Sequence, residues 1–86
     1  MIDRQMPKDL TLEQAIGQVL RKERLDRGLN QIDIAVATNF GVRSIRTMEQ
    51  GKQSMTIRSL DALAMYFQLP IEEVIIRAKR LRTSSL

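Results

Sequence analysis

Apolar residues recur at helical spacing along most of this chain, and no segment has the strict alternation of a half-buried strand. The first helix is expected to begin at Thr11, a favourable N-cap, and to end at Gly28. Gln14 lies three residues after Thr11 and completes a capping box, in which the two side chains bond each other's backbone N–H groups. The apolar positions that mark this helix are Leu12, Ile16, Val19 and Leu20.

Two short helices are expected next, over residues 31–38 and 42–50. Asn30 caps the first of them. Asn39 follows where the chain must reverse, because Asn tolerates a left-handed backbone better than most residues. Gly51 ends the second short helix.

The remaining pattern predicts two further helices. Thr56 caps the fourth, and Pro70 is suited to begin the fifth. Glu72 and Glu73 lie in the first turn of the fifth helix, where the helix dipole favours acidic side chains. The apolar positions of the fourth helix are Ile57, Leu60, Leu63, Ala64 and Phe67.

The composition fits one small helical domain. Eighty-six residues suffice for a single domain, and only 3% of them are aromatic. The core must therefore consist of aliphatic side chains and Met, which favours helices packed on helices. We expect an all-α, five-helix domain over residues 11–82, with a mobile N-terminal arm at 1–10 and a frayed tail at 83–86.

Several classes of function are excluded by what the chain lacks. It has no Cys and no His, which rules out disulfides, Cys/His zinc sites, cysteine nucleophiles and His bases. Ser44, Ser54 and Ser59 therefore have no His partner, and we expect no enzyme activity, cofactor, metal or small-molecule ligand. No apolar stretch could span a bilayer and no secretory leader is evident, so a cytoplasmic protein without a membrane partner is expected.

The segment from Asn30 to Lys52 has the arrangement of a helix-turn-helix, two short helices joined by a short turn. Ala35 supplies the small residue that lets the two helices approach. On the second helix, Ile45 and Met48 fall on one side and should face the core. The opposite side carries a polar stripe at positions i, i+3, i+4 and i+7: Arg43, Arg46, Thr47 and Gln50.

This stripe matches the chemistry of DNA. Arg can bond guanine with two hydrogen bonds, Gln can do the same for adenine, and the Thr methyl can contact thymine. Between Phe40 and Arg58 the only acid is Glu49, whereas the basic residues are Arg43, Arg46, Lys52 and Arg58. In a chain of net charge +4, the positive field concentrates on this stripe, so we expect DNA reading rather than an ordinary solvated face.

A set of residues also carries a family resemblance: Arg24, Gly28-Leu29-Asn30-Gln31, Ile34-Ala35, Ile45, Glu49, Gly51-Lys52, Leu60 and Phe67-Gln68-Leu69. With them, the segment from Ile16 to about Ile75 resembles the phage-repressor-like helix-turn-helix family. That family includes phage repressors, restriction–modification controller proteins and many antitoxins. The resemblance implies its five-helix DNA-binding fold.

The resemblance also implies roles for individual residues. Gln31 would bond a phosphate and brace a reading side chain, and Gln50 and Lys52 would lie near the DNA backbone. Arg24 and Glu49 would form a salt bridge that ties the first helix to the recognition helix. The full expected DNA-binding set is Gln31, Gly41, Val42, Arg43, Ser44, Arg46, Thr47, Gln50 and Lys52.

Four positions depart from the family pattern. Asn39 stands where the turn usually has Gly, and Met55 stands where Pro is common. Gly41 replaces the usual Ser or Thr cap, so it has no hydroxyl to offer a phosphate. Val42 is apolar where relatives often carry a hydrogen-bonding residue, and it either touches a thymine methyl or packs.

The fifth helix raises a separate question, because Val74, Ile75 and Ile76 are consecutive apolar residues. One core-facing stripe cannot cover three residues that lie 100° apart, so either the helix is unusually buried or a second face meets a partner. The small size of the domain and the family's tendency to dimerise here favour a homodimer. The expected interface residues are Ile71, Val74, Ile75 and Ala78, with the dimerising face left open.

Two functions of different classes remain. The first is a transcription regulator, a dimeric repressor or controller that reads a palindromic operator in double-stranded DNA and associates with the nucleoid. Its half-sites would lie about 34 Å apart. The second is an antitoxin or interaction module whose main partner is another protein. The basic stripe favours the first, and the two can coexist.

Overall fold

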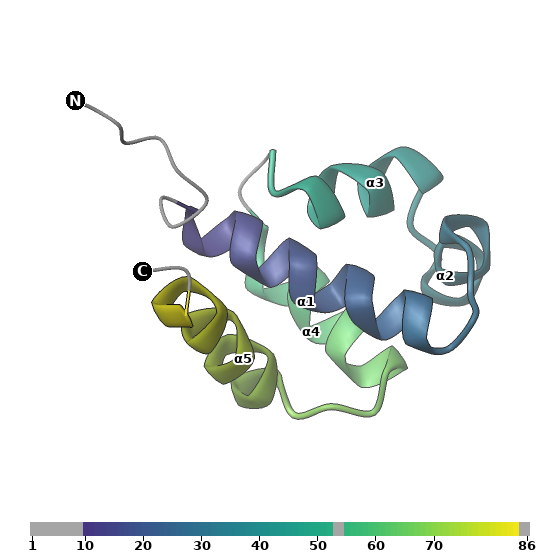
Figure 1. Ribbon diagram of the computed structural model, residues 1–86. Helices are drawn as coiled ribbons and strands as arrows, with labels where there is room; N and C mark the ends of the chain where they lie inside the picture. Colours follow the sequence, from purple (N-terminus) through teal and green to yellow (C-terminus); the bar gives the residue numbers. More distant parts are fainter. Residues whose placement is uncertain (1–9, 53–54, 85–86) are drawn as a thin grey trace.

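The computed structural model describes residues 10–52 and 55–84, and it contains all five predicted helices (Figure 1). They are α1 (Leu12–Asp26), α2 (Gln31–Thr38), α3 (Val42–Gln50), α4 (Ile57–Tyr66) and α5 (Ile71–Ser84). The described part of the chain has no strand, so the all-α prediction is confirmed. The expected N-terminal arm lies outside the described residues except for its last residue, Leu10.

Side-chain caps begin the first, second and fourth helices where the sequence predicts. The Gln14 N–H donates to the Thr11 hydroxyl at 3.0 Å, and the Thr11 N–H donates back to the Gln14 side chain at 2.9 Å. Asn30 forms a second reciprocal box with Asp33, with both bonds at 2.9 Å. Thr56 accepts from the backbone of the residue three positions later at 3.0 Å. These bonds satisfy N–H groups that a helix start otherwise leaves free.

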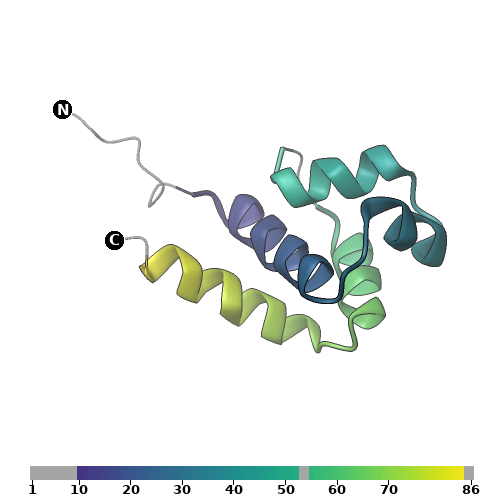
Figure 2. The ribbon, with the colours of Figure 1, turned by 45° about the vertical axis from the view of Figure 1, so that its right-hand side comes forward.

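The helices pack around one aliphatic core with α1 at its centre. In both views α3 and α5 lie on opposite sides of α1 (Figures 1 and 2), while α2 packs against α3 and α4. The buried hydrophobic residues are Ala15, Ile16, Val19, Leu20, Ile34, Ala35, Ile45, Met48, Leu60, Leu63, Ala64, Phe67, Val74 and Ala78. Only one aromatic ring is among them, as the composition predicts.

The fifth helix corrects part of the expected dimer interface. Val74 and Ala78 are 0% exposed, because residues four apart share the helix face that packs into the core of their own chain. They therefore offer no surface to a partner. Ile71 and Ile75 are partly buried against the core, whereas Ile76 is 42% exposed.

The expected frayed tail, residues 83–86, overlaps the end of α5. Thr83 and Ser84 belong to the last turn of α5. The Thr83 hydroxyl donates to the carbonyl of Lys79 at 3.0 Å, a bond within the helix that supports this turn. Residues 85–86 of the expected tail lie outside the described part of the chain.

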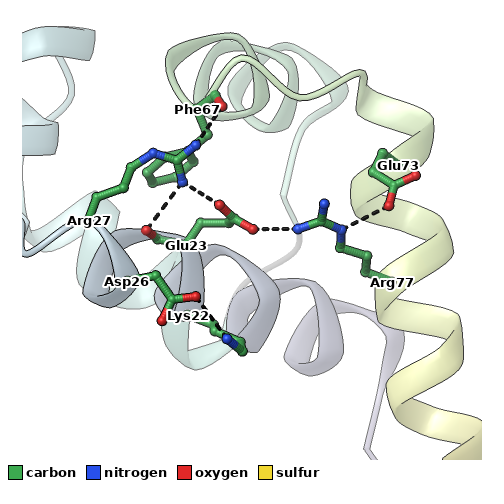
Figure 3. A network of polar contacts seen from close by, with 7 residues as sticks. All are labelled: Lys22, Glu23, Asp26, Arg27, Phe67, Glu73 and Arg77. Atoms are coloured by element: carbon green, nitrogen blue, oxygen red, sulfur yellow. Dashed lines mark hydrogen bonds and ion pairs between the residues drawn. The ribbon is translucent and has the colours of Figure 1, made fainter.

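A network of charged side chains joins α1 to α5 and to the end of α4 (Figure 3). Arg27 and Arg77 donate to different oxygens of the Glu23 carboxylate. Arg27 also donates to the Phe67 carbonyl at 2.9 Å and stacks over the Phe67 ring, 4.8 Å from its centroid. Arg77 donates to Glu73 at 2.9 Å, and this bond is the main cause of its raised pKa. The network fixes α5 against α1.

No helix in residues 10–52 and 55–84 combines the length and the apolar character needed to cross a membrane.

Candidate nucleic-acid interface

Helices α2 and α3 form the predicted helix-turn-helix. Asn39 has φ 62° and ψ 26°, so it takes the left-handed turn position in place of Gly. Gly41 is the N-cap of α3 and makes no side-chain cap bond. The first backbone N–H groups of α3 are consequently left without a side-chain acceptor, and this end of the helix carries the positive end of the helix dipole.

The two faces of α3 are sharply different. Ile45 and Met48 are buried, as predicted, and Val42 is partly buried against the core. Thr47 is also partly buried, and its hydroxyl donates to the Ser44 carbonyl at 3.0 Å. The exposed positions at and around this helix are Gly41, Arg43, Ser44, Arg46, Gln50 and Lys52. The polar stripe is therefore presented to solvent except for Thr47.

The cations of this surface are not engaged by the protein itself. The side chains of Arg43, Arg46 and Lys52 form no hydrogen bond or ion pair with any residue of the described part of the chain. Their donors are free for an external anion or for the acceptors on base edges.

The one acid of this segment is neutralised inside the domain. Arg24 donates to Glu49 through Nε at 2.7 Å and through Nη2 at 3.0 Å, and the two side chains are 9% and 5% exposed. Arg24 Nη1 also donates to the Leu29 carbonyl at 2.9 Å. Glu49 thus ties α3 to α1, and its negative charge does not reach the exposed face of α3.

Gln31 joins the same cluster. Its amide Nε2 donates to Glu49 Oε1 at 3.1 Å, so the side chain at the start of α2 contacts the acid of α3. The bracing contact that the resemblance implies is therefore made to Glu49 and not to a base-reading side chain. The amide nitrogen carries a second N–H, which this bond does not use.

The interpretation of the sequence missed Gly17, which lies where α1 crosses α3. A Cβ at Gly17 would lie 2.4 Å from the Glu49 carbonyl oxygen and 2.5 Å from that of Met48. Gly in a helix interior costs about 1 kcal/mol relative to Ala, so its place in α1 needs a packing reason. An isolated Gly within a strongly periodic helix is the signal that could have found this close contact.

Comparisons with known proteins agree with this geometry. The family model described as helix-turn-helix matches residues 20–74, which include the whole of α2, α3 and α4. A comparison with curated protein sequences gives no significant match.

Several solved structures have a similar fold. The clp gene regulator ClgR from Corynebacterium glutamicum has a TM-score of 0.82 and 21% identity, covering 87% of this chain and 80% of that one. The restriction–modification controller C.AhdI from Aeromonas hydrophila has a TM-score of 0.67 and 23% identity, covering 71% and 92%. The controller C.Esp1396I, solved as a tetramer with its natural 35-base-pair operator, has a TM-score of 0.75 and 21% identity, covering 87% and 99%. Because the family match spans well over half of the sequence, the chain belongs to the helix-turn-helix family of DNA-binding regulators.

Proposed function

We propose that this chain is a transcription regulator that reads a specific operator by placing the exposed face of α3 in the major groove. The observation that carries the proposal is the state of the charges on α3. Among the described residues, Arg43 and Arg46 are exposed and have no hydrogen-bond or ion-pair partner, while Glu49 is buried and neutralised by Arg24. A helix with this distribution presents donors and no acid to an approaching duplex.

The residues divide by the part of DNA that they would contact. Arg43, Arg46 and Thr47 would read base edges, and Val42 lies at the edge of the same surface. Gln31 and Lys52 would contact phosphates, which set the register of a protein on the duplex without carrying sequence information. The other proposed backbone contacts are Gly41, Ser44 and Gln50.

We further propose that two copies bind a palindromic site, each reading one half. Ile76 is the most exposed apolar residue of α5. Ile71 and Ile75 are only partly buried against the core, so each keeps some apolar surface. Helix α5 lies on the side of α1 opposite α3, so pairing through α5 would leave both recognition helices uncovered (Figures 1 and 2). This arrangement would act in the cytoplasm, at the nucleoid.

Selection of bound fragments from random DNA, followed by affinity measurements on the selected site and a scrambled one, tests the proposal. The wild-type protein should enrich a palindrome and bind it about a thousand-fold more tightly than the scrambled duplex. The double variant R43A/R46A should lose this preference. Lys22→Ala, which removes a 76% exposed cation from α1, should retain it. Enrichment of no sequence, or equal affinity for both duplexes, would contradict the proposal, and co-purification of a small protein partner would favour an interaction module.

A further inference from the structure

We infer that Gly17 and Gly51 are positioning residues for the recognition of DNA sequence. Because neither has a side chain, α3 can lie close enough to α1 for the exposed face of α3 to be aligned with the base edges. This inference rests on the proposed function. It concerns residues that touch no DNA and lie on the inner side of the recognition helix. Their part in specificity would be exerted only through the place they give to α3.

The contact at Gly17 is made to backbone, and a change of rotamer cannot relieve it. A Cβ there would lie 2.4 Å from the Glu49 oxygen, 2.5 Å from the Met48 oxygen and 2.8 Å from the Glu49 carbonyl carbon. Ordinary contact needs about 3.5 Å. Even one methyl group would therefore displace α3 from α1 by roughly 1 Å.

A second contact of the same kind lies at the end of α3. Gly51 has φ +66°, and a Cβ there would lie 2.4 Å from the Gln14 Cα and 2.6 Å from the Gln14 nitrogen. Gln14 is itself held by the capping box with Thr11. Gln14 and Gly17 are one turn apart on α1, so the two contacts together support the C-terminal half of α3.

The distance between α3 and α1 matters because the proposed phosphate contacts and the proposed base contacts come from different helices. Gln31 is on α2, whereas Arg46 and the rest of the reading face are on α3. A displacement of about 1 Å would put the base contacts out of register with the phosphate contacts, and a hydrogen bond at 3.6 Å or more is no longer effective. Non-specific attraction to phosphates, which depends on net charge, would survive.

Two glycines provide a matched experiment. Gly28 has φ +69°, close to the φ of Gly51, but a Cβ at Gly28 would meet nothing within 4 Å. Asn is the non-Gly residue best suited to this backbone region, so Gly28→Asn and Gly51→Asn impose similar backbone strain and differ in the steric contact. Gly28→Asn should keep the wild-type ratio of operator affinity to scrambled-DNA affinity. Gly51→Asn should lower that ratio roughly ten-fold or more with little change on scrambled DNA.

A second pair tests the contact from the α1 side. Gly17→Ala should lower the same ratio, and Gln18→Ala, at the exposed neighbouring position, should not. Leu63→Ala serves as a control for lost stability, because it opens a cavity on α4, an element that is not part of the α1–α3 contact. All variants are measured at a temperature where circular dichroism finds them folded. If Gly17→Ala does not fold, the Gly51 and Gly28 pair still decides.

A readout without DNA completes the test. The chain has no Cys, so spin labels can be placed on cysteines introduced at Arg21 and Ser44, both exposed. The distance between the labels should change by roughly 1 Å in Gly51→Asn and stay constant in Gly28→Asn. This inference alone would be overturned if the wild type prefers the operator and Gly51→Asn keeps the same affinity ratio. It would also be overturned if Gly28→Asn or Leu63→Ala lowers the ratio as much as Gly51→Asn does. A wild type without sequence preference would overturn the proposed function as well.

Discussion

Arg24 holds both carboxylate oxygens of Glu49, at 2.7 and 3.0 Å, in a contact that is almost closed to solvent. Removing either partner leaves an unpaired buried charge. Arg24→Ala and Glu49→Ala should therefore each lower the free energy of unfolding by about 3–5 kcal/mol. Urea denaturation of the wild type, both single variants and the double variant should give a double-variant loss well below the sum of the single losses.

The chain offers a control for this ion pair. Lys22 and Asp26 form a pair at 2.8 Å whose side chains are 76% and 56% exposed. Solvent screens such a pair, so Lys22→Ala should leave the midpoint of unfolding nearly unchanged. Small and additive losses for Arg24→Ala and Glu49→Ala would show that their pair behaves like this exposed one.

Arg43 and Arg46 should each read a particular base pair. If either side chain bonds a guanine, its change to Ala should cost roughly 1–3 kcal/mol of binding per half-site, confined to one position of each half-site. Binding of each variant to a panel of single-base operator changes measures this. The same loss on every duplex would reassign the residue to a phosphate contact.

Lys52 should act through its charge. Its change to Ala should weaken binding to specific and non-specific DNA alike. It should lower the slope of log K against log salt by about 0.9 for each copy bound, and by about twice that for a dimer on its operator. Lys22→Ala removes the same charge from α1, at a side chain that is 76% exposed, and should leave the slope unchanged. A wild-type slope in Lys52→Ala would remove Lys52 from the interface. For Gln31→Ala and Gln50→Ala, which change no charge, we expect a uniform loss of affinity without a change of slope.

Ile76 should belong to the dimer contact. Because it is 42% exposed, Ile76→Glu should give a folded monomer whose operator affinity is lower by orders of magnitude, since the second half-site is no longer engaged in the same complex. Val74→Glu would instead place a charge in the core and should unfold the chain. Sedimentation equilibrium distinguishes these outcomes. If Ile76→Glu forms dimers as the wild type does, the interface lies elsewhere.

Much of the fold could be predicted from the sequence because its signals are local. Thr11, Asn30 and Thr56 bond N–H groups three residues away, and Asn39 adopts the backbone region that its side chain tolerates. The 3.6-residue period then separates the buried and exposed faces of α3. Family resemblance supplied the pairing of Arg24 with Glu49, which lie 25 residues apart in sequence.

The errors concern distances between elements, which local patterns do not encode. Periodicity indicates that Val74 and Ala78 share a face, but not whether their own chain or a partner covers that face. The backbone contact at Gly17 depends on how closely α1 and α3 approach. The bond from Gln31 to Glu49 depends on the angle between α2 and α3, which follows from packing around Ile34 and Ala35.

Because Val74 and Ala78 are buried by their own chain, a single copy already has a closed core. Folding and dimerisation are then separate equilibria. At a low total concentration of the protein, most copies would be folded monomers and few would be in the proposed dimer. Below the dissociation constant of the pair, its concentration rises with the square of the amount of protein, so operator occupancy would climb steeply over a narrow range. A regulator of this kind would respond steeply to its own concentration, so a small change in its rate of synthesis would cause a larger relative change in operator occupancy.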